Sequence, residues 1–191
     1  MGGLRSGSES NVVDFVTIAS TGNAADFGDL TVAGYVGATV GNNIRAMYAG
    51  GYRGGASSVI DYITIATTGN AIDFGDTATQ YNRAGTGSNT RGVFAGGRNP
   101  YIATIESIQF ATLGDDVAFG DLTVARGYAS GCSNNQRGCF SGGHSPGDIK
   151  NIIDYITIAS AGDAADFGDM ITAANYTGSC SQGHGGIEEG E

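Results

Sequence analysis

A twelve-residue pattern recurs four times along the chain and constrains the fold more than any other feature. It reads ASTGNAADFGDL at residues 19–30 and returns as ATTGNAIDFGDT at 66–77, ATLGDDVAFGDL at 111–122 and ASAGDAADFGDM at 159–170. The copies are spaced by 47, 45 and 48 residues. A period of this length favours stacked or radially arranged repeats over independent domains.

Two further elements accompany the copies. Runs with alternating apolar residues precede them: DFVTIA, DYITIA, ESIQFA and DYITIA, starting at Asp14, Asp61, Glu106 and Asp154. Segments ending in Gly-Gly lie between the copies: RAMYAGG, RGVFAGG and RGCFSGG, starting at Arg45, Arg91 and Arg137. In the last full unit we expect strands through 123–133, at 137–141, at 152–159 and through 165–167. Four antiparallel strands per unit are typical of a propeller blade, and a parallel β-helix is the rival architecture.

Composition agrees with short strands joined by many turns. Glycine supplies 34 of the 191 residues and proline only 2, which excludes collagen and disfavours a helical bundle. Nineteen acidic and nine basic residues give a net charge of −10, so we expect no nucleic-acid partner and no anionic lipid surface. No apolar run has the length of a membrane span, and residues 1–6 lack the apolar core of a signal peptide.

The order of these elements resembles the kelch repeat over nearly the whole chain. Phenylalanines stand where kelch repeats usually carry tryptophan: Phe27, Phe74, Phe119 and Phe167. Arg126, in the segment LTVAR, stands where the kelch arginine is found. The amino-acid sequence of the repeats is also similar to that of repeats in large virion and tail-associated proteins of bacteriophages. The resemblance implies an all-β, kelch-like β-propeller and a place in a phage particle.

We predict a single repeat domain over residues 1–186, followed by an acidic tail at 187–191. Its units span about 1–30, 31–77, 78–122 and 123–170, with a closing strand within 171–186. The terminal blade would then combine strands from both ends of the chain and make a ring of four blades. Kelch rings generally contain six or seven blades. Two chains forming an eight-blade ring, or a higher homo-oligomer, therefore remain alternatives.

The recurrent glycines and acids are expected to be structural. The Gly-Gly pairs lack the spacing of a phosphate-binding loop and precede no predicted helix, which favours a backbone role; they are Gly50 and Gly51, Gly96 and Gly97, and Gly142 and Gly143. The Asp-Phe-Gly-Asp segments supply too few oxygens for a calcium site by themselves, and aspartate commonly caps turns. We therefore predict no metal and no cofactor, with calcium binding as the alternative.

Charged residues open two neighbouring strands in each unit. Arg45, Arg91 and Arg137 open the second strand, and the acids open the third, so we expect pairing between the two sets. A ring of catalytic carboxylates is the alternative. Glycosidases need two acids in distinct environments, whereas these acids are equivalent by repeat. No catalytic residues are predicted.

Cysteine and histidine are too sparse to suggest catalysis. Cys132 and Cys139 should face each other across a hairpin, as packed thiols or as a cross-strand disulfide. Cys180 and His184 form a C-x-x-x-H spacing, and His144 is the only other histidine. A zinc site needs four ligands, and no Ser-His-Asp set is apparent.

The segment after each Gly-Gly pair varies most. Counting Gly2–Gly3 as the first pair, it has 10, 9, 8 and 10 residues before the third-strand acid, while the turn between the third and fourth strands keeps one length. Variable loops on a rigid frame often carry recognition, and arginine and tyrosine are frequent in interfaces. The predicted contact residues are Tyr52, Arg53, Arg98, Tyr101 and His144.

Together these features predict a non-enzymatic binding or structural module of a phage virion or tail. Its partners would be other virion proteins or host-surface glycans. The alternatives are an extracellular location as a secreted bacterial adhesin, and a lyase or glycosidase that uses the same face.

Overall fold

The computed structural model describes residues 1–181, and strands are its only regular secondary structure in that range. All paired strands run antiparallel. The predicted all-β class is confirmed. The described residues contain no helix with the length and apolarity to cross a membrane.

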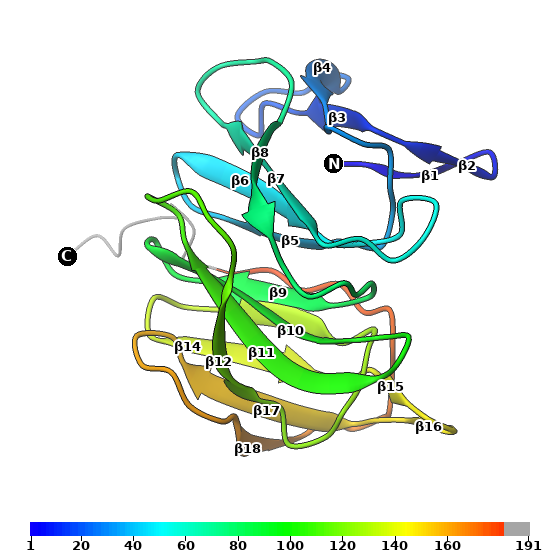
Figure 1. The fold of residues 1–191 in the computed structure, drawn as a ribbon, viewed down its shortest axis with the longest axis vertical. Coiled ribbons are helices and arrows are strands. Elements are labelled where there is room, and N and C mark those ends of the chain that lie inside the picture. Colours follow the sequence, from blue (N-terminus) through cyan, green and yellow to red (C-terminus); the bar gives the residue numbers. More distant parts are fainter. Residues whose placement is uncertain (182–191) are drawn as a thin grey trace.

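Three sheets have four strands each, in the same order (Figure 1). The first contains β5 (Ala38–Gly41), β6 (Arg45–Ala49), β7 (Val59–Thr64) and β8 (Ile72–Asp76). The second contains β9 (Ala84–Gly87), β10 (Arg91–Gly97), β11 (Ile102–Gln109) and β12 (Val117–Asp121). The third contains β13 (Ser130–Ser133), β14 (Arg137–Ser141), β17 (Ile152–Thr157) and β18 (Ala165–Asp169). Each sheet therefore arises from one period of the sequence.

The remaining strands form two-stranded sheets. β3 (Val12–Phe15) pairs with β4 (Ala25–Asp29) and corresponds to the third and fourth strands of the larger sheets. β1 (Gly3–Arg5) pairs with β2 (Ser8–Ser10), and β15 (His144–Ser145) pairs with β16 (Asp148–Ile149). The last two pairs are hairpins inside the variable segments that follow Gly-Gly.

Successive units meet through a repeated contact, which we call a junction. The turn before the fourth strand of one unit donates a backbone hydrogen bond to the fourth strand of the preceding unit. The bonds run from Gly69 N to Phe27 O, Gly114 N to Phe74 O, and Gly162 N to Phe119 O, at 2.7, 2.9 and 2.7 Å. This contact explains the conserved spacing of the turn and the fourth strand within the period.

The glycine of the recurrent Phe-Gly-Asp segment lets the two backbones approach at each junction. A Cβ placed on Gly28, Gly75 or Gly120 would lie 2.3, 2.4 or 2.2 Å from the carbonyl oxygen of Gly69, Gly114 or Gly162, respectively. No real Cβ tolerates such a distance from backbone, so only glycine fits. Part of the glycine excess is therefore a requirement of packing between units.

The hydrophobic core runs through the junctions. Phe27 packs with Ile63, Phe74 with Ile108, and Phe119 with Ile156, so that each core cluster joins two successive units. The three phenylalanines are 6, 3 and 4% exposed. Phe167 occupies the same position in the last unit but is 55% exposed, because no unit follows it in the described structure.

The Gly-Gly pairs also lie where backbone segments meet. Gly50, Gly96 and Gly142 have φ values of 61, 63 and 64°, in the left-handed region that favours glycine. A Cβ on Gly96 would lie 2.2 Å from the Arg126 carbonyl oxygen, and one on Gly142 would lie 2.3 Å from that of Ala174. Geometry of the main chain is thus a sufficient reason for glycine at these positions.

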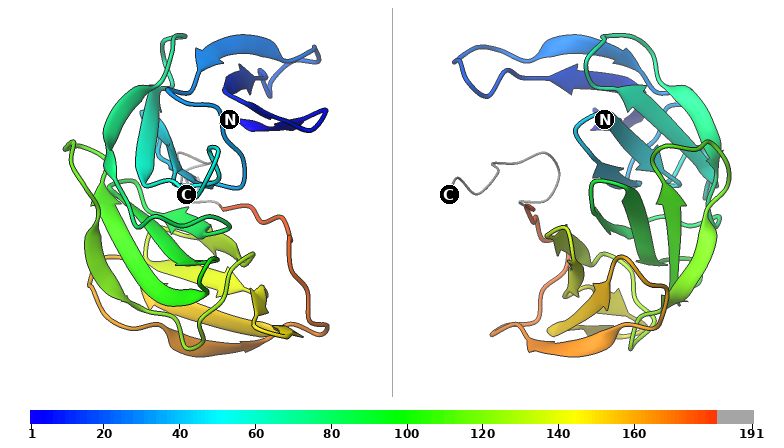
Figure 2. Two further views of the ribbon diagram at one scale, coloured as in Figure 1. Left: turned by 45° about the vertical axis from the view of Figure 1, so that its right-hand side comes forward. Right: turned by 90° about the vertical axis from the view of Figure 1, so that its left-hand side faces the viewer.

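The sheets follow one another along an open arc, with β3–β4 near one end and the β13–β18 sheet near the other (Figure 2). Residues 171–181 contain no assigned strand, and they run beside β13, where Ser179 Oγ donates to Gly131 O at 2.6 Å. The rest of the predicted closing strand and the acidic tail, residues 182–191, lie outside the described residues. A terminal blade shared between both ends stays a prediction.

Candidate binding site on the loop face

The acid that opens the third strand is bound by arginine in every unit. Three of these ion pairs lie inside the protein: Arg53–Asp61, Arg83–Glu106 and Arg126–Asp154, at 2.8, 2.7 and 2.8 Å. The fourth, Arg5–Asp14, is exposed. The prediction that Arg45, Arg91 and Arg137 pair with these acids was wrong. The arginines that bind the acids lie in the variable segment or just before the first strand, and not at the start of the second strand.

Arg45, Arg91 and Arg137 instead stack on aromatic rings, those of Tyr62, Phe119 and Tyr155. The Arg91 guanidinium also donates to the carbonyl oxygen of Ile158 at 2.7 Å, and that of Arg45 donates to the carbonyl oxygen of Phe110 at 2.5 Å. Both carbonyls belong to the following unit. Arg45 and Arg91 therefore fasten one unit to the next, whereas the stacking contact of Arg137 lies within its own unit.

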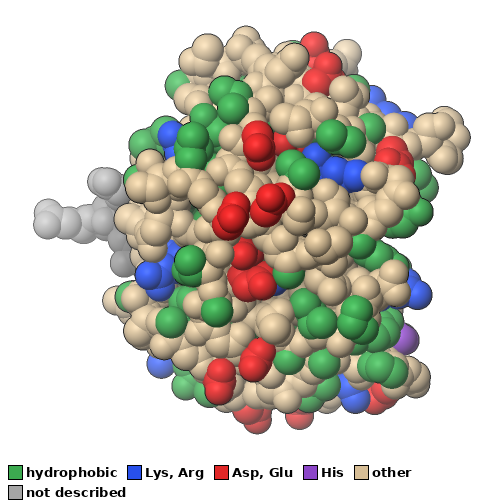
Figure 3. Space-filling model, in the orientation of Figure 1, with side chains coloured by type: hydrophobic (Ala, Val, Ile, Leu, Met, Phe, Trp, Pro, Cys, Tyr) green, Lys and Arg blue, Asp and Glu red, His purple; other side chains and the backbone are tan. Residues whose placement is uncertain are grey.

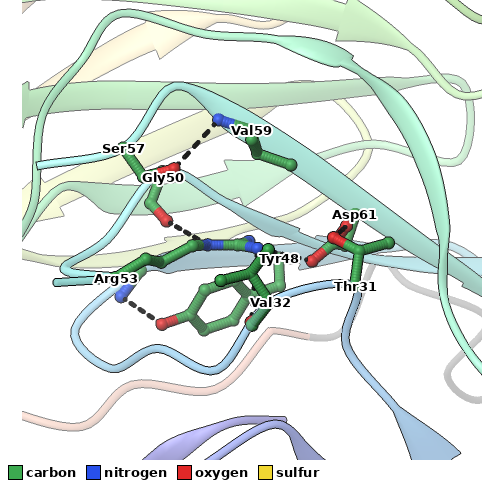
Figure 4. Close-up of polar contacts among 9 residues, drawn as sticks. Thr31, Val32, Tyr48, Gly50, Arg53, Ser57, Val59 and Asp61 are labelled. Carbon is green, nitrogen blue, oxygen red and sulfur yellow. Dashed lines mark hydrogen bonds and ion pairs between the residues drawn. The ribbon is translucent and has the colours of Figure 1, made fainter. Parts of the chain in front are cut away.

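Arg53 was predicted to contact a partner, and the structure places its charge in the interior. Its guanidinium lies over the ring of Tyr48 and bonds Asp61, while Thr31 donates to the other carboxylate oxygen of Asp61 (Figure 4). The Arg53 side chain is only 3% exposed. Its predicted binding role is replaced by a structural one, since burial in an ion pair leaves the charge unavailable to a ligand.

The other predicted contact residues gather at one end of the sheets. Tyr52, Arg98 and His144 directly follow Gly-Gly, and their amides donate to the carbonyl oxygens of Tyr35, Tyr81 and Gly127 at 2.9, 2.9 and 2.8 Å. These bridges occupy the same place in three successive units. They hold the start of each variable segment against the residues that precede the first strand of the same unit.

Aromatic contacts connect these positions within and between units. Tyr52 packs against Tyr35 and Tyr81, with ring centroids 5.4 and 5.9 Å apart. His144 lies between Tyr101 and Tyr128, and its Nδ1 is hydrogen-bonded to the Tyr101 hydroxyl at 2.7 Å. We call the full set the tyrosine band; it comprises Tyr35, Tyr52, Tyr81, Arg98, Tyr101, Tyr128, His144 and Tyr176.

Sequence reasoning missed Tyr35, Tyr81, Tyr128 and Tyr176. Tyr35 and Tyr81 share one position of the repeat, and Tyr128 and Tyr176 share the next. A tyrosine recurring just before the first strand was the available signal, but its partners across the sheet become visible only in the fold.

The band is polar at its rim and carries one fixed positive charge. Arg98 lies over the Tyr128 ring and bonds its hydroxyl, which raises the Arg98 pKa. A hydrogen bond with Tyr128 and, secondarily, burial raise the pKa of Tyr176 to about 12, so this phenol is neutral at physiological pH. Acidic side chains instead gather in a line over β8 and β12 (Figure 3).

A cavity of about 460 Å³ lies between the first strands, lined mainly by small and hydroxyl side chains such as Thr39, Thr86 and Ser130. Within residues 1–181, no three His, Cys, Asp or Glu side chains converge as metal ligands. The Cys180–His184 spacing extends beyond the described residues.

Cys132 and Cys139 face each other in register, as predicted, and both are free thiols. Burial and the neighbouring Cys132 raise the pKa of Cys139. In comparison with known proteins, the chain matches no family model and no curated sequence.

Proposed function

We propose that the protein is a non-enzymatic, kelch-like binding module whose contact surface is the tyrosine band. Three four-stranded sheets in one strand order, joined by equivalent junctions, support a propeller-type frame. One observation carries the functional proposal. Tyr52, Arg98 and His144 come from variable segments, and all three contact tyrosines that precede the first strands.

The chemistry of the band suits recognition. Tyrosine offers a large, rigid contact area with a polar tip, and arginine adds directional donors, which is why both are enriched in interfaces. The internal third-strand acids are each neutralised by arginine, which supports a structural role for them over acid–base catalysis.

The partner classes are host-surface glycans and other proteins of a virion. The similarity of the repeat sequences to those of phage tail-associated proteins supports the virion as the location. A secreted adhesin would use the same band on a cell surface.

Binding of the purified protein to an array of bacterial surface glycans, and to the other proteins of the particle that contains it, tests the proposal. Tyr52→Ala and Tyr176→Ala should each weaken binding at least tenfold, because each removes contact area from the band. Tyr155→Ala, which changes a half-buried tyrosine outside the band, is the matched control and should change affinity less than twofold.

Circular dichroism of every variant should show the wild-type strand signal. Binding that is indifferent to both band substitutions would contradict the proposed surface. Catalytic turnover of a glycan by the purified protein would contradict the non-enzymatic assignment.

A further inference from the structure

The C-terminal end of the arc exposes the half of a junction that is buried everywhere else. Phe167 is 55% exposed, whereas Phe27, Phe74 and Phe119 are at most 6% exposed. A Cβ on Gly168 would meet no atom within 4 Å, whereas one on Gly75 would lie 2.4 Å from the carbonyl oxygen of Gly114. This end therefore presents an apolar ring beside a backbone shaped for close approach.

The N-terminal end exposes the opposite half. Val16 is 58% exposed, while the residues that match it in the repeat, Ile63, Ile108 and Ile156, are 7, 3 and 2% exposed. Ile18 is 97% exposed, whereas its counterparts Ile65, Phe110 and Ile158 are 44, 2 and 1% exposed. In the second and third internal junctions both side chains share a core cluster with the fourth-strand phenylalanine of the preceding unit, and in the first junction Ile63 does so.

The turn at the N-terminal end also carries the polar part of a junction. Its residues Gly22 and Asn23 match Gly69 and Asn70 in the repeat. In the first junction, Asn70 Oδ1 accepts a hydrogen bond from Asp29 N at 3.1 Å, and Gly69 N donates to Phe27 O. The turn thus contains the groups that would bond Asp169 N and Phe167 O.

We propose that two copies of this chain associate head to tail, with the 16–24 segment of one copy seated on β18 of the other. The contact would be a fourth instance of the junction that the chain already makes three times internally. It is independent of the tyrosine band and of the ligand proposed for it.

The chain's own N-terminal end is a poorer occupant of β18. The two ends lie at opposite ends of the arc (Figure 2), and closure on itself would require the three internal junctions to change. Each has backbone atoms in close contact at a glycine, which leaves little room for rotation. A second copy satisfies both exposed halves without altering any unit.

The proposed contact joins unlike surfaces, so every added copy leaves one free half of each kind until a ring closes. This property allows a complementation experiment with two single substitutions. Phe167→Asp places a charge in the C-terminal half of the contact and leaves the N-terminal half intact. Ile18→Asp places a charge in the N-terminal half and leaves the C-terminal half intact. Both positions are exposed, so neither change should unfold a separate chain.

Light scattering coupled to size-exclusion chromatography, at micromolar concentration, measures the outcome. The wild-type chain should have a mass that is a multiple of 19.3 kDa, and each variant alone should be a monomer. An equimolar mixture of the two variants should form a species of twice the monomer mass, using the one intact contact. Ile72→Asp, at a residue 58% exposed within the arc, is the control and should assemble like the wild type.

A wild-type chain that stays monomeric would overturn the proposal, including the case in which its own N-terminal end covers Phe167. So would assembly that persists in both single variants, because a different surface would then hold the copies together. Variants that are monomeric alone and stay monomeric when mixed would show that the contact is not head to tail.

Discussion

Arg126 Nη1 lies 2.8 Å from Asp154 Oδ2, and neither side chain has any exposed surface. The same carboxylate accepts hydrogen bonds from the backbone and hydroxyl of Thr123, and Arg126 also donates to Phe140 O. The pair therefore ties the approach to the first strand to the second and third strands of one unit. An unpaired charge at this depth is costly, so the pair is expected to be sensitive to removal of either partner.

Arg126→Ala should lower the free energy of unfolding by about 3–5 kcal/mol, because Asp154 would remain buried without its counter-charge. Denaturant titration measures the change. Arg5→Ala removes the exposed pair with Asp14 and is the control, with an expected effect below about 0.5 kcal/mol. Equal effects of the two substitutions would show that burial of the inner pair is not what makes it important.

Close backbone approach at a junction is tested by comparing two glycines with similar φ. Gly75 and Gly168 have φ values of 150 and 138°, so alanine strains both, but only Gly75 faces a backbone carbonyl. In a Phe167→Asp background, which keeps chains separate, Gly75→Ala should cost about 2 kcal/mol more than Gly168→Ala in denaturant titration. A similar cost for both would mean that φ strain alone explains the recurrent glycine.

Much of the strand arrangement could be predicted from the sequence, because the alternating apolar residues of the strands and the glycine-containing turns recur in every repeat unit. The predicted strand at 137–141 coincides with β14, and Cys132 faces Cys139 as expected. The first strand of that unit is shorter than expected, β13 beginning at Ser130, because Thr123 and Arg126 precede it and bind Asp154.

The arginine partners could not be predicted, because identical acids recruit arginines from different places. Asp61 is bound by Arg53, which follows Gly-Gly, whereas Asp154 is bound by Arg126, which precedes the first strand. The repeat pattern predicts only the positions that the units have in common, and the arginine partners occupy positions that differ from unit to unit. For the same reason Arg53 looked like a surface residue in the sequence.

Stability should depend on pH through Asp116. Burial is the main cause that raises its pKa from 3.8 to about 6, and the nearby Glu106 carboxylate acts in the same direction. Because the folded state holds this proton more tightly than the unfolded chain, the contribution to stability is present below about pH 4 and is lost as pH rises through 6.

Asp116→Asn should therefore match the wild type near pH 4 and be more stable above pH 6. After allowance for solvent around this half-buried group, we expect a difference of about 1 kcal/mol. Thermal unfolding between pH 4 and pH 8 measures it, with the exposed Asp73→Asn as control. A wild-type advantage above pH 6 would contradict the direction of the shift.

The three thiols should differ in reactivity. Cys180 is exposed, whereas Cys132 and Cys139 are half-buried and the pKa of Cys139 is raised by burial. Limited alkylation followed by peptide mass spectrometry should modify Cys180 first, and reductant should leave the unfolding temperature unchanged. Isolation of a Cys132–Cys139 disulfide from the untreated protein would contradict the free-thiol state.

Amide hydrogen exchange at the junction turns tests most directly the claim that equivalent junctions build the frame and that one half-junction is left open. The amides of Gly69, Gly114 and Gly162 donate across junctions, whereas that of Gly22 has no backbone acceptor among residues 1–181. We predict slow exchange at the first three at any concentration, and exchange at Gly22 that is fast in dilute protein and slows as concentration rises. Exchange at Gly69, Gly114 and Gly162 as fast as at Gly22 in dilute protein would contradict the account.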